Sequence, residues 1–147
     1  MKIAIASDHA GVDLKKYLKE QMEKKGIDVT DVGPYDKDSV DYPDYAQKMC
    51  GLVTSKEADL GIAICGTGVG MSIACNKVPG IRASLCSEAF SAKMTRLHND
   101  SNVLCLGARV TGEELALDIL EAYLEHDFSG EERHQRRIDK LEGGLDE

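Results

Sequence analysis

Short apolar segments alternate with segments of helical periodicity along the chain, and this alternation restricts the fold more than any other feature. Strands are predicted at residues 2–6, 28–32, 60–64, 81–85 and 103–106. Helices are predicted at 12–25, 42–55, from the glycine-rich loop to 76, from 87 to 98, from 111 to 125, and across the charged tail 130–141. Five strands with intervening helices imply a parallel sheet that is covered on both faces. The expected fold is α/β: one Rossmann-like, three-layer domain with a C-terminal helical tail.

Length and charge limit the possible partners. The 147 residues suit a single domain, residues 1–147, that can bury a core without staples. A net charge of −8 argues against a broad surface for nucleic acid or an anionic membrane, because both need a basic face. The first apolar segment is too short for a signal peptide, and no apolar run reaches membrane-spanning length. We therefore expect a cytoplasmic protein.

The cysteines support the same compartment. They are Cys50, Cys65, Cys75, Cys86 and Cys105. An odd number without a C-x-x-C pair fits neither a disulfide framework nor a zinc site. Most are expected to be small buried apolar residues in a reducing compartment. The four histidines show no metal-ligand spacing, so we expect no metal.

The strand ends predict where ligands bind. In parallel α/β sheets, ligands bind at the carboxyl ends of the strands. This rule places Ser7–His9, Cys65–Gly70, Cys86–Glu88 and Gly107–Arg109 on one functional edge. Two helix starts near this edge carry capping signals: Ser87 as an N-cap, and the capping box that begins at Thr111.

The loop Cys-Gly-Thr-Gly-Val-Gly at 65–70 is the strongest chemical motif. Its alternating glycines let backbone N–H groups converge, and the following helix adds its positive end. Such a loop suits an anion or a developing oxyanion. The spacing fits neither a Walker loop nor G-x-G-x-x-G, because Met71 stands at the third glycine position. A tight strand-to-helix turn is the alternative.

Cys65 stands at the start of this loop. A thiol beside a helix N-terminus is favoured as thiolate, so it can serve as a base or a nucleophile. A phosphocysteine enzyme would need an arginine six residues later, where this chain has Met71. Proton transfer is therefore the better interpretation than phosphoryl transfer, and a buried core cysteine is the alternative.

Two histidine motifs are predicted at opposite edges of the sheet. Asp8 and His9 follow the first strand, where a carboxylate and an imidazole could reach one ligand; helix capping by Asp8 is compatible with that role. His98 closes the fourth helix, where a protonated imidazole would complement the helix dipole. If His98 acts together with Cys65, it should come from a neighbouring subunit.

The segment Arg-His-Gln-Arg-Arg at 133–137 is a basic cluster in an acidic chain. Arg133 and Arg137 share a helix face, and this like-charge pair is mildly unfavourable alone. A phosphate would reverse the sign of the interaction, because guanidinium groups match its oxygens. A solvated face paired with nearby carboxylates explains the cluster equally well.

Together, these motifs resemble ribose-5-phosphate isomerase type B. The resemblance runs in order along nearly the whole chain, through residues 7–11, 41–43, 65–70, 76–77, 80–83, 98–100 and 133–137. Each motif is weak alone, and the ordered set is specific. The wider family includes isomerases of 6-phosphohexoses such as allose and galactose 6-phosphate.

The resemblance implies an aldose–ketose isomerase that interconverts ribose 5-phosphate and ribulose 5-phosphate through an enediolate, without a cofactor. It implies that Cys65 is the base, that His98 assists ring opening, and that Asp8 and Thr67 are the polar partners of His98. It assigns phosphate and substrate contacts to His9, Arg109, Arg133 and Arg137. It implies that Asn99 and the backbone of Gly66, Gly68, Val69 and Gly70 hold the enediolate oxygens. It also implies a homodimer with composite sites, or a dimer of dimers.

Two alternatives remain open from the sequence. The first keeps the enzyme and changes its substrate to a 6-phosphohexose. The second is a nucleotide-binding module of similar shape without catalysis, which would have no need for Cys65 at the strand end.

Overall fold

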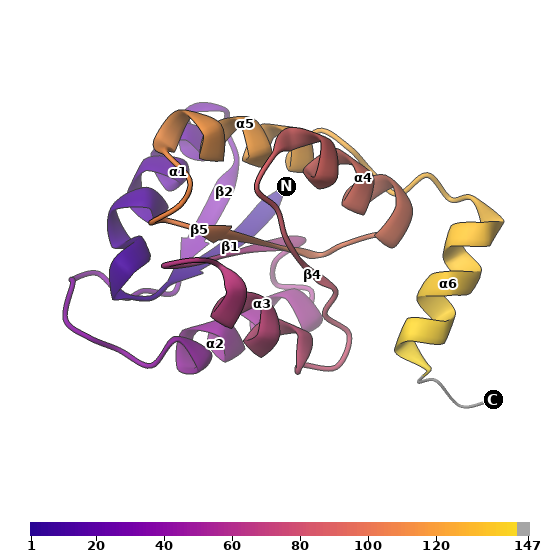
Figure 1. Cartoon of the computed structure of the whole chain (residues 1–147), viewed down its shortest axis with the longest axis horizontal. Helices are drawn as coiled ribbons and strands as arrows, with labels where there is room; N and C mark the ends of the chain where they lie inside the picture. The colour runs from indigo at the N-terminus through magenta and orange to yellow at the C-terminus, as the bar shows by residue number, and fades with distance from the viewer. Residues whose placement is uncertain (144–147) are drawn as a thin grey trace.

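The computed structural model describes residues 1–143 and contains one five-stranded sheet in which all strands are parallel, in the order β2-β1-β3-β5-β4 (Figure 1). The strands are β1 (Lys2–Ser7), β2 (Asp28–Asp31), β3 (Leu60–Cys65), β4 (Ala83–Leu85) and β5 (Val103–Gly107). The α-helices are α1 (Val12–Lys24), α2 (Tyr42–Thr54), α3 (Val69–Asn76), α4 (Ala89–Asn99), α5 (Glu113–Leu124) and α6 (Glu132–Glu142). The predicted α/β class with a helical tail is confirmed, and the last four residues of the predicted range 1–147 lie outside the described residues.

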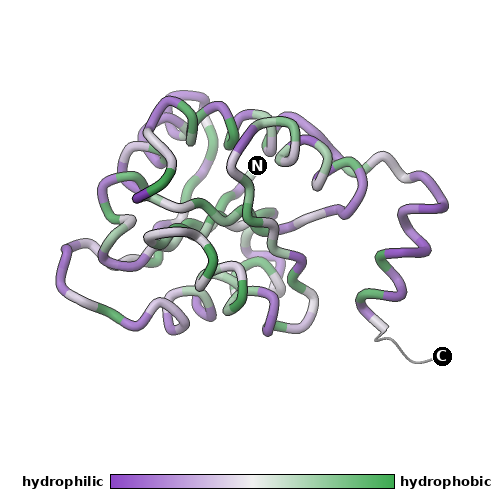
Figure 2. The backbone as a smooth tube through the Cα atoms, viewed as in Figure 1, coloured by the Kyte–Doolittle hydropathy of each residue, from purple (hydrophilic) through white to green (hydrophobic). Residues whose placement is uncertain are grey.

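Alternate residues of the central strands pack into two separate cores. The larger side chains face α1, α4 and α5, and they are Ile3, Ile5, Ile62, Ile64, Leu104 and Leu106. The smaller ones face α2 and α3, and they are Ala4, Ala6, Ala63, Cys65, Val103 and Cys105. Figure 2 shows the resulting apolar centre between more polar outer helices. Because these strands are buried on both faces, they appear in the sequence as continuous apolar runs.

Two predicted helix caps are wrong. Glu88, not Ser87, is the N-cap of α4, and its carboxylate accepts from the Ser91 N–H at 2.9 Å. The capping box at Thr111 does not form, because α5 has Gly112 as its N-cap without a side-chain cap. Thr111 instead donates its N–H to the Gly107 carbonyl at 2.9 Å, and so belongs to the turn that follows β5.

The strand order places a crevice at the carboxyl ends of β1 and β3. The chain moves outward from β1 to β2, and then crosses β1 to continue with β3. Ligands bind at such a reversal of strand order. The Asp8 N–H donates to the Ile64 carbonyl at 2.9 Å, which joins the two strand ends directly at the crevice.

The last helix stands apart from the sheet. Figure 1 shows α6 beside the end of α4, away from the other helices, and its buried residues are His134 and Ile138. Within residues 1–143, no helix combines the length and the apolar character that crossing a membrane would require.

Gly11 provides a test of the packing at the crevice. A Cβ at this position would lie 2.7 Å from Ile64 Cγ2 and 2.9 Å from the Ser7 Cβ. We expect Gly11→Ala to lower the free energy of unfolding by about 1–3 kcal/mol, because the strand ends must separate. The matched control is Gly51→Ala, where a Cβ in α2 meets no atom within 4 Å; it should stabilise the protein by about 0.5–1 kcal/mol. Urea unfolding compares the two, and shifts of the same sign would contradict this account.

Candidate active site

The glycine-rich loop forms the turn between β3 and α3, as the sequence predicts. Gly68 is the N-cap of α3 and has a φ of +81°, in the left-handed region. A Cβ on Gly68 would lie 2.9 Å from the Leu106 carbonyl carbon, so β5 also excludes a side chain here. The turn therefore needs glycine both for its conformation and for its close approach to β5.

Cys65 ends β3 with its sulfur under this turn. The Gly68 N–H donates to Cys65 Sγ at 3.2 Å, and the residue is 5% exposed. A backbone N–H and the start of a helix beside the sulfur both stabilise negative charge on it. The arrangement therefore supports the reactive-thiol interpretation, although Cys65 also packs in the core that faces α2 and α3.

The other four cysteines are also buried, within the two cores. Burial raises the pKa of the Cys86 thiol to about 11. The pKa of Cys50 is raised by its hydrogen bond with Cys75 and by burial, and that of Cys75 is raised first by its hydrogen bond with Cys105. These raised values describe thiols that stay protonated, as expected for small core residues.

Asp8 follows β1 and is 8% exposed. Its Oδ1 accepts from the Ala10 N–H at 2.9 Å and from the Gly11 N–H at 3.2 Å. The capping interpretation is therefore confirmed for one carboxylate oxygen. Asp8 also lines the pocket beside Cys65, so its two predicted roles are geometrically compatible.

An open pocket of about 460 Å³ lies over the loop at the carboxyl edge of the sheet. It is lined by Asp8, Tyr42, Cys65, Gly66, Thr67, Val69, Gly70, Ile73 and Arg109. Arg109 reaches it from the turn after β5, where its N–H donates to the Gly66 carbonyl at 2.9 Å. The structure thus brings together seven of the predicted site residues, with Gly68 hydrogen-bonded to the thiol just beneath them.

Two residues of this pocket had no predicted role. Tyr42 begins α2, and its ring lies against Gly70, where a Cβ would be 3.0 Å from the tyrosine hydroxyl oxygen. Ile73 lies one turn into α3 and is 57% exposed. Tyr42 belongs to the Asp-Tyr-Pro motif at 41–43, which could have indicated it; Ile73 carries no comparable signal.

His9 starts the single turn of 3₁₀ helix that follows Asp8. Its Nδ1 accepts from the Val40 N–H at 3.3 Å. In the neutral ring the proton must then lie on Nε2, which leaves that nitrogen available as a donor. His9 is half-buried beside Asp8 and is oriented by the segment that leads into α2.

His98 lies near the C-terminus of α4, at the amino edge of the sheet, as predicted. Its ring stacks on His134 of α6, with centroids 4.2 Å apart. Burial, and next the proximity of His98, lower the pKa of His134, which favours a neutral ring in the stack. Sequence reasoning placed His134 in the basic cluster and missed this contact.

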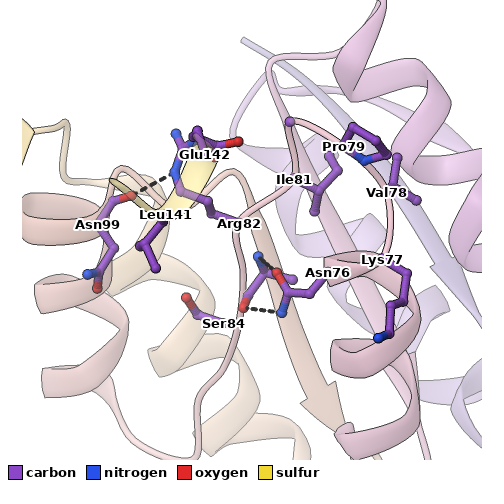
Figure 3. Close-up of a pocket in the computed structure, with 12 residues that line it drawn as sticks. Asn76, Lys77, Val78, Pro79, Ile81, Arg82, Ser84, Asn99, Leu141 and Glu142 are labelled. Carbon is purple, nitrogen blue, oxygen red and sulfur yellow. Dashed lines mark hydrogen bonds and ion pairs between the residues drawn. The ribbon is translucent and has the colours of Figure 1, made fainter. Parts of the chain in front are cut away.

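Asn99 lines a second pocket, of about 540 Å³, between the segment that follows α3 and the end of α6 (Figure 3). The Arg82 Nε donates to the Asn99 carbonyl at 2.9 Å, and its guanidinium also pairs with Glu142 of α6 at 2.5 Å. Cys65 and Asp8 line the first pocket and not this one.

The predicted phosphate-binding arginines of α6 are both exposed. Arg133 Nε donates to Glu131 Oε2 at 2.9 Å, and this contact lowers the pKa of Glu131. The solvated-face interpretation is thus supported for Arg133. Neither Arg133 nor Arg137 lines the pocket that contains Cys65.

The predicted site is therefore divided between two regions. One holds a thiol, a carboxylate, a hydroxyl and the glycine-rich loop at the carboxyl edge. The other holds two imidazoles and two arginines at the amino edge and on α6. The first region can move a proton beside a group that becomes an oxyanion.

Comparison with known proteins identifies the family. Residues 3–141 match the family described as ribose/galactose isomerase. Ribose-5-phosphate isomerase B of Escherichia coli is 46% identical over 140 residues, which are 95% of this chain and 93% of that protein.

Solved structures agree with the sequence comparison. The ribose-5-phosphate isomerase B of Clostridium thermocellum has a TM-score of 0.95 at 50% identity, covering 97% of this chain and 96% of that chain. The enzyme of Mycoplasma genitalium with bound ribulose 5-phosphate has a TM-score of 0.91 at 43% identity, covering 97% and 94%. With a family match and structural agreement over nearly its whole length, this chain belongs to the ribose/galactose isomerase family.

Proposed function

We propose that the protein interconverts ribose 5-phosphate and ribulose 5-phosphate. The observation that carries the proposal is the Cys65 sulfur, which accepts a hydrogen bond from the Gly68 N–H in a pocket shared with Asp8 and Arg109. The chain belongs to an isomerase family, and a relative of the same fold binds ribulose 5-phosphate. Membership of this family favours an isomerase over a non-catalytic nucleotide-binding module.

The chemistry proposed for Cys65 is proton transfer between adjacent carbons. After the sugar ring opens, the thiolate removes the proton from C2, and the electron pair forms an enediolate with negative charge on oxygen. The backbone N–H groups of the Gly66–Gly70 loop that do not bond Cys65 Sγ or Thr67 Oγ1 stabilise that charge. Asp8 and Thr67 act as polar partners of His98 in ring opening. The O2 hydroxyl proton then passes to O1, and the thiol returns its proton to C1. This gives the ketose and restores the thiolate, so the step needs no cofactor.

The phosphate contacts are proposed for basic groups from both regions. Arg109 lines the Cys65 pocket, and His9 follows the pocket residue Asp8 and can donate from its Nε2. Arg133 and Arg137 provide further guanidinium groups on α6. Asn99 would hold an enediolate oxygen, and His98 would assist ring opening.

A homodimer would reunite the divided site. A strand of five or six residues separates the two edges of a sheet by about 15–20 Å, which no side chain crosses. A two-fold axis can place the α4–α6 end of one subunit over the pocket of the other. Exposed apolar side chains beside the pocket, Val69 at 49% and Ile73 at 57%, would be covered by that contact. A dimer of dimers would keep the same pairs.

A 6-phosphohexose is the second candidate substrate, because the matching family is described by both ribose and galactose. Parallel assays with ribose 5-phosphate, allose 6-phosphate and galactose 6-phosphate distinguish the two. We further propose that residues 1–147 form one catalytic domain that acts in the cytoplasm, where the five free, buried cysteines stay reduced.

Cys65→Ala should lower kcat by about 10²–10⁴-fold, because the base is removed while the pocket and fold remain. Stopped assays of ketose formation and NMR detection of solvent exchange at C2 measure the loss. Cys50→Ala is the control, since it removes a buried thiol from α2 outside the pocket. Exchange at C2 that continues at the wild-type rate in Cys65→Ala would exclude the thiol as the base.

Arg137→Ala should weaken phosphate binding far more than stability. A charge-assisted hydrogen bond contributes about 1.5–3 kcal/mol, whereas an exposed ion pair contributes about 0–1 kcal/mol. Competitive inhibition by inorganic phosphate and thermal unfolding measure the two effects. Arg136→Ala, one exposed residue earlier on α6, is the matched control. Equal phosphate affinity in both variants would support the solvated-face interpretation instead.

Mixing inactive Cys65→Ala and His98→Ala chains should restore activity. Each mixed dimer would contain one intact and one doubly damaged site, so random exchange should regain about a quarter of the wild-type activity. Native mass spectrometry must first show the mixed dimer. Complete exchange without any gain over the separate variants would refute the shared site.

A further inference from the structure

Lys15 is a buried cation that the proposed chemistry does not use. It lies on α1, its side chain is 2% exposed, and its Nζ is 2.7 Å from Asp31 Oδ1. Removing an ammonium from water is costly, and a well-packed apolar pair in place of a buried ion pair is often as stable or more so. Stability alone is therefore a weak explanation for Lys15.

The Lys15 ammonium contacts the start of the segment 32–41, which connects β2 to α2. Its Nζ also donates to the Pro34 carbonyl at 2.5 Å, and it lies 5.0 Å from the centre of the Tyr35 ring. Asp31 holds the same stretch, because its Oδ1 accepts from the Gly33 N–H at 2.9 Å. Figure 1 shows this segment as the long purple loop beside α1 and before α2.

The other end of the segment reaches the pocket. The Val40 N–H donates to His9 Nδ1, which sets the proton on the opposite nitrogen of that ring. Two residues later, Tyr42 lines the pocket and lies against Gly70 of the glycine-rich loop. Between these contacts the side chains from Tyr35 to Ser39 are exposed. The segment is also held by the Ser7 N–H on the Gly33 carbonyl at 3.2 Å and by the exposed ion pair of Lys37 with Asp13 at 2.8 Å.

We propose that Lys15 is a positioning residue, which fixes the segment 32–41 and thereby sets His9 and Tyr42 in the geometry that the substrate pocket requires. The inference rests on the proposed function in taking that pocket as the substrate site. Lys15 acts through Asp31 and Pro34. Neither hydrogen bond of its ammonium goes to the glycine-rich loop. The thiol on β3 therefore keeps its place when Lys15 is lost.

The variant that tests this is Lys15→Met with Asp31→Asn. Methionine keeps most of the side-chain volume, and asparagine keeps an oxygen for the Gly33 N–H without leaving a buried charge unpaired. Lys19→Met is the control, because Lys19 lies one turn further along α1 in a partly exposed pair with Glu23 at 3.6 Å. Two independent readouts are measured on the full-length protein.

The first readout is kinetic. We expect KM for ribose 5-phosphate to rise about tenfold while kcat stays within about threefold, because binding groups move and the base does not. A loss of folded protein would instead lower kcat at an unchanged KM. An unchanged KM, or a fall in kcat alone, would overturn the inference.

The second readout is the order of the segment itself. Lys37 lies within it, so cleavage by trypsin after Lys37 should become about tenfold faster in the double variant and not in Lys19→Met. Unchanged cleavage would overturn the inference whatever the substrate. If the wild type does not convert ribose 5-phosphate, the proposed function fails separately, and KM is then measured with whichever 6-phosphohexose it converts.

Discussion

The parallel pairing of β3 with β1 on one side and β5 on the other is the constraint on which the rest of the structure depends. All six residues of β3 are buried, so its position is determined by packing on both faces. The register pairs Ser7 with Ile64, and Cys65 with Gly107. Three strands therefore end at one level, and the loops that follow them converge over the crevice. The thiol, the Asp8 carboxylate and Arg109 are neighbours for this reason alone.

The same pairing separates the two halves of the proposed site. A helix that connects parallel strands returns to the amino edge, so α4 carries His98 away from Cys65. The helix α6, which follows α5 in the chain, packs on α4, and its buried residues are His134 and Ile138. A single chain thus presents the proposed proton-transfer pocket at one edge and a cluster of imidazoles and guanidinium groups at the other. This separation is the basis of the proposed two-fold dimer, in which each half of the proposed site would meet its complement in a second copy.

Buried charges hold the irregular parts of the chain rather than its core. Lys15 joins α1 to the segment after β2, and Arg96 donates to the Ser101 carbonyl at 2.5 Å and the His126 carbonyl at 3.1 Å. Arg82 binds the carbonyls at the end of α4 and the Glu142 carboxylate of α6. Backbone groups outside helices and strands need partners when they are buried, and long cationic side chains reach several of them at once.

The amino-acid sequence by itself determined the α/β class, the order of the elements and the group of residues at the carboxyl edge. Apolar runs and helical periodicity are local, and the rule for parallel sheets converts them into neighbours such as Asp8 and Cys65. Only the tertiary structure decided the contacts that no local sequence pattern signals. Glu88 replaces Ser87 as a cap because its carboxylate reaches Ser91, and Tyr42 enters the pocket by lying against Gly70 of the glycine-rich loop. Such contacts depend on distances between distant parts of the chain, which periodicity and residue type do not encode.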